Sequence, residues 1–234
     1  MDGGEFSFWR DHTTISLSPV AAPSVLGLFG FAGATFIVAA NLAGWYGSTT
    51  TTPTFLFPFA AMFGGLAQFL AGMWAYRARD TLATAMHGTW GSFWLGYGIL
   101  YLLVAVHVLV PPTPFRALGF WFIALAAITW SGTVAALAVN LSLASVLATL
   151  AAGATCEAVG MISGSSAWRT TGAYIFIASA VLGWYTATAI MFESTFKRVV
   201  LPVGRVGGST NRPGGLPGEP IQYRAGEPGV KIGQ

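Results

Sequence analysis

Residues 63–72 read FGGLAQFLAG, an apolar run that contains one amide side chain. Ala60, Gly64, Gln68 and Gly72 follow one another at intervals of four, so in a helix they share one face. That face has almost no side-chain bulk and one hydrogen-bonding group. Small faces of this kind allow helices to approach closely within a lipid bilayer. The run therefore predicts a membrane-spanning helix whose glycine face either packs against a neighbour or lines a pathway.

The composition extends this interpretation to the whole chain. Of 234 residues, 54% are hydrophobic and only 8% are charged, and the mean hydropathy is +0.65. Soluble domains contain about 25% charged residues, so the predicted fold class is an all-α integral membrane protein. Six apolar stretches have close to the ~20 residues that a spanning helix needs. These transmembrane helices are expected at residues 20–42, 55–76, 86–110, 117–139, 141–162 and 171–192.

The basic residues predict the orientation of the chain, because cytoplasmic connections are enriched in Lys and Arg. Only Arg116 and Arg169 fall on one side of the predicted bundle. The side shared by both termini carries Arg10, Arg77, Arg79, Lys197, Arg198 and Arg205. We therefore expect a multi-pass plasma-membrane protein with both termini in the cytoplasm. Residues 1–18 form an N-terminal segment, 19–198 the transmembrane transport domain, and 199–234 a Pro/Gly-rich tail. Glu193 is expected to hold the last helix to this tail by a salt bridge.

The sequence contains no pattern that predicts catalysis. HExxH and GxSxG motifs are absent, and no span contains paired carboxylates. His87 and His107 stand at opposite ends of one predicted helix, about 30 Å apart, which is too far to hold one haem between them. Lys197 and Lys231 lie outside the spans, which excludes a Schiff-base chromophore in the membrane. We expect no enzyme activity, no cofactor, no metal ion and no nucleic-acid partner.

Two titratable residues stand out within the predicted spans. Glu157 is the only carboxylate well inside a span, and such a residue is expected to face the protein interior or a water-filled cavity. It would either take part in proton transfer or lie near its helix end as a neutral or hydrogen-bonded group. His87, beside the inner interface, would act either as a structural hydrogen-bonding group or as a proton relay.

The remaining polar groups suggest what could cross the bilayer. No Lys or Arg lies within the predicted hydrocarbon region, so an anion would meet no full countercharge there. This favours a small neutral solute, or an anion that moves together with a proton. Gln68 needs a partner helix, water or a solute, because an unpaired amide in hydrocarbon costs several kcal/mol. The neutral donors inside the spans are Thr35, Asn41, Gln68, Thr89, Ser92, Tyr97 and Thr129.

Four sequence blocks resemble the signatures of the acetate uptake transporter family, the succinate–acetate permeases. They are GLFGF at 27–31, FGGLAQFLAG at 63–72, TWGSFW at 89–94 and FKRVVLPVG at 196–204. Their order and spacing extend the resemblance from about residue 18 to residue 204. The resemblance implies a six-helix protomer in a homo-hexameric ring, with a separate pathway through each protomer. It also implies uptake of acetate and related short carboxylates, by proton symport or by channel-like conduction.

Family members narrow this pathway with bulky apolar residues from three helices. The positions that match here are Phe31, Trp90 and Leu150, and relatives commonly have Tyr in place of the Trp. The family's amino-terminal NPAPLGL reads VAAPSVLGL in this chain, at residues 20–28. These departures concern the substrate range more than the fold.

The resulting hypothesis is a transporter or channel for acetate and related acids such as succinate and lactate. The carboxylate would pass between the first, second, third and fifth helices and meet Gln68 and Ser92. Thr35 and Tyr97 are expected as further pathway residues. The carboxylate would then cross the constriction formed by Phe31, Trp90 and Leu150. Two alternatives stay open. A channel for a small neutral solute such as ammonia or urea would use the same pore. A non-transporting membrane scaffold or sensor would use the glycine faces for packing alone.

Overall fold

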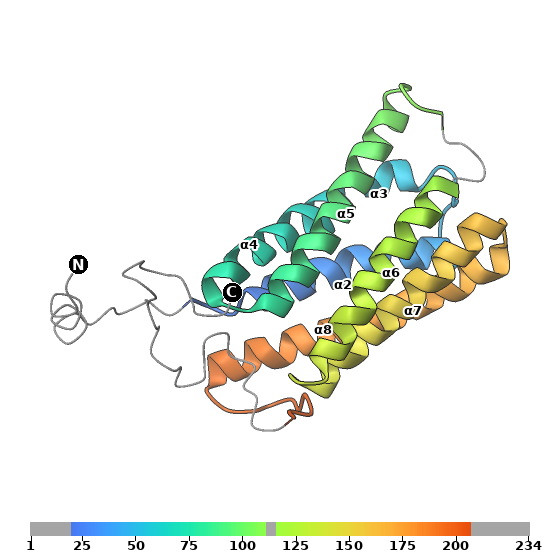
Figure 1. Ribbon diagram of the computed structural model, residues 1–234. Coiled ribbons are helices and arrows are strands. Elements are labelled where there is room, and N and C mark those ends of the chain that lie inside the picture. Colours follow the sequence, from blue (N-terminus) through green and yellow to red (C-terminus); the bar gives the residue numbers. More distant parts are fainter. Residues whose placement is uncertain (1–19, 111–115, 207–234) are drawn as a thin grey trace, which may run out of the picture.

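The computed structural model describes residues 20–110 and 116–206, which form a bundle of six antiparallel helical spans (Figure 1). The second span is continuous over α3 (Pro53–Phe59), η1 (Ala60–Ala67) and α4 (Gln68–Ala78). The other spans are α2 (Pro23–Leu42), α5 (Thr81–Ala105), α6 (Arg116–Ala136), α7 (Leu141–Ser163) and α8 (Ser166–Phe196). The prediction of an all-α membrane protein with six spans is confirmed.

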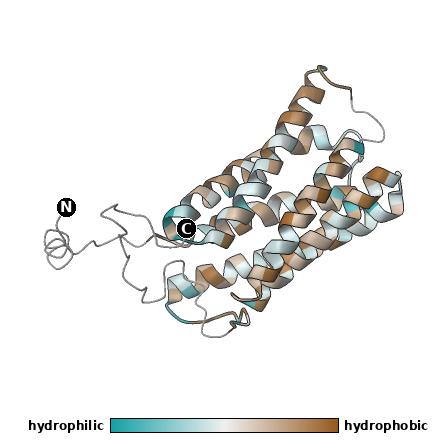
Figure 2. Cartoon of the chain, viewed as in Figure 1, coloured by the Kyte–Doolittle hydropathy of each residue, from teal (hydrophilic) through white to brown (hydrophobic). Residues whose placement is uncertain are grey.

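Five of the six spans are both long and apolar enough to cross a membrane; α5 is the exception. This helix has 25 residues, and its His, Trp and Tyr side chains lower its hydropathy. His87, Trp90 and Trp94 on α5 are nevertheless buried inside the protein. The lower hydropathy of α5 therefore comes partly from its internal face. Figure 2 shows hydrophilic residues gathered towards the ends of the bundle, as expected for a protein that spans a bilayer.

Short turns connect α4 to α5, α6 to α7 and α7 to α8. Arg79 ends α4 in the left-handed region at φ 57°, and Asp80 caps α5 by accepting a hydrogen bond from the Ala83 N–H at 2.9 Å. Gly164 ends α7 at φ 75°, and Ser165 follows as the N-cap of α8. The start of α2, the α4–α5 turn and the end of α8 lie at one end of the bundle (Figure 1).

The glycine face of the second span is a packing face. Pro58 interrupts the hydrogen bonding of α3, because it has no N–H, and the following segment η1 is a π-helix. Ala60, Gly64, Gln68 and Gly72 are all buried. A Cβ atom at Gly64 would lie 2.6 Å from Cγ of Trp94, and one at Gly72 would lie 2.7 Å from the backbone N of Gly88. The missing side chains let this span approach α5 closely.

The corresponding row of small residues on α5 points elsewhere. A Cβ atom at Gly88 or Gly96 would meet nothing within 4 Å, and Ser92 between them is exposed. Besides the contacts of Gly64 and Gly72, α5 meets the second span through Gly91, where a Cβ atom would lie 2.6 Å from the backbone N of Phe69. The intervals of four along α5 therefore mark an outward face of the bundle.

The helices divide into two groups that α2 joins (Figure 1). On one side α7 packs against α6 and α8, and α8 packs against α2; on the other side α2 packs against η1 and α4, which pack against α5. Among the described helices, the backbone of α5 approaches α6 over a short stretch only and does not come close to α7. The α5 and α7 helices are therefore held apart across the interior of the bundle.

The first residues after α8 fold back against the bundle. The N–H groups of Leu141 and Ser142 donate to the carbonyls of Gly204 and Val203 at 2.9 and 3.0 Å. Glu193 forms an ion pair with Arg205, so the expected salt bridge between the last helix and the following segment is present. Residues 199–206, which the sequence assigns to the tail, are thus docked. The rest of the predicted tail and the N-terminal segment 1–18 lie outside the described residues.

Replacing Gly72 by Val should disrupt the bundle, because its side chain would collide with the α5 backbone. Overpacking costs about 3 kcal/mol where backbone cannot move. Gly33→Val is the matched control, since a Cβ atom at Gly33 meets nothing within 4 Å. Thermal unfolding in detergent should show a lowered midpoint only for Gly72→Val. Equal midpoints for both variants would contradict the close approach.

Candidate transport pathway

Two cavities extend into the bundle from opposite ends. The larger cavity, of about 260 Å³, lies among the start of α2, the α4–α5 turn and the α6–α7 turn, and Ser24, Asp80 and Asn140 line it. The smaller cavity, of about 100 Å³, lies among the end of α2 and the starts of α3, α6 and α8, and Asn41 and Arg169 line it. Together the cavities follow the interior between α5 and α7.

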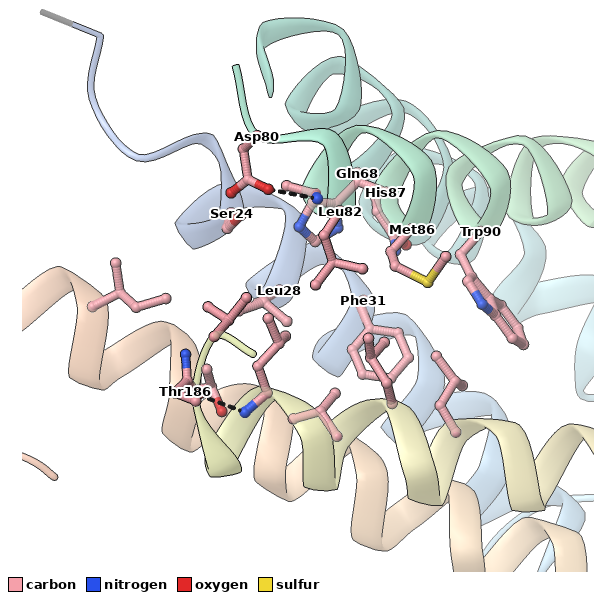
Figure 3. A pocket seen from close by; sticks show the side chains of 18 of the residues that line it. Ser24, Leu28, Phe31, Gln68, Asp80, Leu82, Met86, His87, Trp90 and Thr186 are labelled. Carbon is pink, nitrogen blue, oxygen red and sulfur yellow. Dashed lines mark hydrogen bonds between the residues drawn. The ribbon is translucent and has the colours of Figure 1, made fainter. Parts of the chain in front are cut away.

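The two cavities meet at large apolar side chains in the middle of the bundle. Trp90 on α5 and Leu150 on α7 line both cavities, and Phe31 on α2 lines the larger one. Each of the three is only 2% exposed. In Figure 3, Phe31 and Trp90 lie on the side of the larger cavity away from Ser24 and Asp80. The structure thus brings together, from three helices, the three residues that the family resemblance selected. We refer to them as the apolar barrier.

Neighbouring residues fix the position of Trp90 in the barrier. Its indole Nε1–H donates to the hydroxyl of Thr129 on α6 at 3.0 Å. Its ring packs edge-on against Phe93 and Phe176, with ring centroids 5.5 and 6.5 Å apart. These contacts hold the indole across the interior. The sequence had identified Thr129 only as one of several neutral hydrogen-bond donors and did not predict that it pairs with Trp90. The polar end of Trp90 is bonded, so its apolar surface is what faces the cavities.

Gln68 and His87 line the larger cavity with unpaired buried atoms. Gln68 is 3% and His87 5% exposed, and neither Gln68 Oε1 nor His87 Nδ1 has a hydrogen-bond partner among the described residues. Gly27 leaves space for the imidazole, because a Cβ atom there would lie 2.5 Å from His87 Cε1. Buried polar atoms are costly unless water or a solute pairs with them. Both side chains are labelled at the cavity in Figure 3.

Thr35, Tyr97 and Glu157 line the smaller cavity. Within the part of the chain that the structure describes, the Thr35 hydroxyl has no hydrogen-bond partner, and the same is true of both carboxylate oxygens of the fully buried Glu157. Arg169 Nε lies 3.8 Å from Glu157 Oε2. In the larger cavity, Arg79 is among the lining residues. Both arginines lie outside the predicted spans, so an anion would meet a full positive charge at each cavity end, and the expectation for the hydrocarbon region stays a prediction.

The placement of Ser92 has to be corrected. It was expected beside Gln68 in the pathway, but it is exposed on the outward face of α5 and lines neither cavity. Its hydroxyl donates to the carbonyl of Gly88 at 2.8 Å. Two residues along a helix correspond to a rotation of roughly 200°, so Ser92 and Trp90 face opposite directions. The spacing of Gly88, Ser92 and Gly96 correctly indicates a shared helix face, but in the structure that face lies on the outside of the bundle.

Several lining residues were not selected from the sequence. Ser24, Asp80 and Asn140 belong to helix ends, and Thr186 of α8 adds a helix that the expected route left out. Little in the sequence indicated that these residues line a pathway, because polar residues at helix ends often serve only as caps. Asp80 and Asn140 indeed also cap α5 and α7. Within residues 20–110 and 116–206, no three His, Cys, Asp or Glu side chains are grouped as a metal site would require.

Known proteins resemble this chain in sequence and fold. The chain is 26% identical to the succinate-acetate/proton symporter SatP of Escherichia coli K12 over 79% of its own length and 96% of SatP. It is 26% identical to ammonia transport outward protein 2 of Saccharomyces cerevisiae, over 72% of this chain and 61% of the yeast protein. It is also 32% identical to acetate permease A of Emericella nidulans, over 42% of this chain and 32% of the permease.

The fold comparison and the family comparison agree. The structure of the bacterial acetate channel SatP matches with a TM-score of 0.73 and 24% identity, over 79% of this chain and 99% of that one. This match shows the same membrane fold. The family model described as the GPR1/FUN34/yaaH family matches residues 6–206. Because that match covers the whole described bundle, the chain is a multi-pass membrane protein that belongs to the GPR1/FUN34/yaaH family.

Proposed function

We propose that this protein carries acetate and related short carboxylates, including succinate and lactate, across the plasma membrane. One observation supports this most strongly: the two cavities extend from opposite ends and meet at the apolar barrier of Phe31, Trp90 and Leu150. A pathway through a single protomer needs such an arrangement. The relatives named for acetate and succinate transport supply the substrate class.

The barrier has a consequence for the charge of the solute. A full charge is costly where only apolar side chains surround it. The carboxylate would therefore cross most easily as the neutral acid or together with a proton. His87 in the larger cavity and Glu157 in the smaller one are buried titratable groups on either side of the barrier. We assign them as the proton-linked residues of a proton-coupled transport cycle.

Transport of labelled acetate into proteoliposomes tests this function. Uptake should exceed that of protein-free vesicles and should rise when an inward proton gradient is imposed, because a proton accompanies the carboxylate. His87→Gln should reduce the rise without abolishing gradient-free uptake. Acetate uptake that does not change with the proton gradient would support channel-like conduction and contradict proton coupling. Absence of any acetate uptake would refute the proposal as a whole.

Shortening the barrier residues should increase flux and loosen selectivity. Phe31→Ala and Trp90→Ala each remove an aromatic ring from the meeting point of the cavities, so acetate uptake should rise severalfold and lactate uptake by more. Phe36→Ala is the matched control, because Phe36 is an exposed aromatic residue of the same helix as Phe31 and lines neither cavity. Initial rates of both acids measure the effect. Unchanged rates and unchanged selectivity in both barrier variants would count against this placement.

Gln68→Leu separates a binding role from a packing role. The change keeps the size of the side chain and removes the amide, whose Oε1 has no hydrogen-bond partner among the described residues, from the larger cavity. A hydrogen bond from the O–H of the protonated acid to Oε1 is worth about 0.5–1.5 kcal/mol, so acetate uptake should fall severalfold. Size-exclusion chromatography should show unaltered assembly. A variant that fails to assemble would identify Gln68 as a contact between helices instead.

Ammonia is the second candidate substrate, because one relative is named for outward ammonia transport. A small neutral molecule would cross the apolar barrier without a proton partner. Ammonia flux in the same vesicles, followed by internal pH, discriminates between the two. Flux of ammonia without uptake of acetate would favour this candidate.

We further propose a homo-hexamer with both termini in the cytoplasm. The outward row of Gly88, Ser92 and Gly96 on α5 offers a face on which another protomer could pack closely. The excess of basic residues at the end that contains the α4–α5 turn supports the orientation. Native mass spectrometry of the purified protein tests the number of protomers. Protease accessibility of the C-terminus in intact cells tests the orientation.

A further inference from the structure

The smaller cavity contains a charged pair that the apolar barrier does not require. Glu157 on α7 is 0% exposed, whereas the side chain of Arg169 in the first turn of α8 is 44% exposed. Two glycines make space for the pair. A Cβ atom at Gly172 would lie 3.2 Å from Glu157 Oε1, and one at Gly160 would lie 2.5 Å from Cγ of Arg169. The missing side chains of these two glycines, one on α7 and one on α8, therefore leave room for Glu157 and Arg169.

The contact between the two charged groups is loose. The 3.8 Å separation of Arg169 Nε and Glu157 Oε2 is longer than a hydrogen bond. Neither carboxylate oxygen has a hydrogen-bond partner among the described residues. A guanidinium has five N–H donors in a planar fork, which fits a carboxylate with two parallel hydrogen bonds. Arg169 is thus partly open to solvent and has donor capacity that Glu157 does not use.

No other charge competes with this pair inside the cavity. Among the described residues that line the smaller cavity, only Glu157 and Arg169 belong to the residue types that carry a full charge at neutral pH. The polar side chains around them include the neutral groups of Thr35, Asn41 and Tyr97. An incoming carboxylate would therefore be attracted by Arg169 and repelled by Glu157. The balance between these two effects depends on how many negative charges the solute carries.

We propose that Arg169 binds the substrate carboxylate at the mouth of the smaller cavity, and that Glu157 determines specificity by favouring monocarboxylates over dicarboxylates. This assignment rests on the proposed function as a carboxylate transporter. A monocarboxylate places one negative charge at Arg169, beside Glu157. A dicarboxylate brings a second negative charge into a cavity of about 100 Å³ whose described lining residues offer no second cation. Repulsion between like charges in such a confined site disfavours the dicarboxylate.

Glu157→Gln tests the specificity role. It keeps the shape of the side chain and removes its negative charge, so succinate should gain more than acetate. Initial uptake rates of labelled succinate and acetate into proteoliposomes, without an imposed proton gradient, should show the succinate-to-acetate ratio rising roughly tenfold, the effect of one like charge at close range. An unchanged ratio would overturn the assignment of Glu157.

Arg169→Gln tests the binding role. Loss of a charged hydrogen-bonding group should raise the KM for acetate roughly tenfold, and Arg169→Lys should give an intermediate KM. Arg116→Gln is the matched control, because Arg116 starts α6 at the same end of the bundle, is exposed and does not line the cavity. Its KM should equal that of the wild type. A KM unmoved in both Arg169 variants would overturn the assignment of Arg169.

A double variant separates a loss of binding from a loss of folding. Arg169→Gln leaves Glu157 as an unpaired buried charge, which itself destabilises a protein. The combination of Glu157→Gln and Arg169→Gln removes both charges, so it should elute like the wild type in size-exclusion chromatography. It should still have the raised KM for acetate. A folded double variant with the wild-type KM would contradict the binding role.

The wild-type measurement distinguishes the two levels of failure. Vesicles containing the wild-type protein that take up neither acid would refute the proposed transport function. Wild-type uptake of acetate combined with an unmoved ratio in Glu157→Gln and an unmoved KM in the Arg169 variants would refute only the inference about this pair.

Discussion

The close approach of the second span to its neighbours is the constraint on which the rest of the structure depends. Apolar surface gives helices no reason to associate in lipid, so contact between backbones and weak polar contacts must hold them together. Gly72 meets the backbone of Gly88, and Gly91 meets the backbone of Phe69. With this half of the bundle tightly packed, α5 is held at a distance from α7. The two cavities lie in the space between these helices.

That space is divided rather than continuous, and the division explains its chemistry. Phe31, Trp90 and Leu150 meet from three helices, with polar groups placed beyond them towards both ends. Thr129 and the aromatic rings around Trp90 keep the indole across the middle. The larger cavity reaches the barrier from one end and the smaller cavity from the other, and a bare charge would cross the apolar side chains only at high cost. Transport of weak acids suits such a layout, since a proton neutralises their charge.

Sequence reasoning succeeded where a residue's environment follows from chemistry alone. The spans were predictable because a bilayer requires about 20 apolar residues per helix, and the burial of Gln68 followed from its glycine-rich surroundings. Phe31, Trp90 and Leu150 were selected through the family blocks, since nothing in their local sequence distinguishes them from other large apolar residues. The prediction that Ser92 lies in the pathway was wrong, because a spacing of four on α5 identifies one helix face but does not show whether that face is turned to the interior or to the exterior of the bundle.

By itself, the sequence determined the membrane class, the six spans and the glycine row that allows close packing, because hydropathy and helical periodicity are local properties. Only the tertiary structure decided which helix faces meet across the interior. It placed Arg169 next to Glu157, joined Trp90 to Thr129, and turned Ser92 to the exterior. These pairings depend on the rotation of each helix about its axis, and that rotation is set by contacts between residues far apart in the chain.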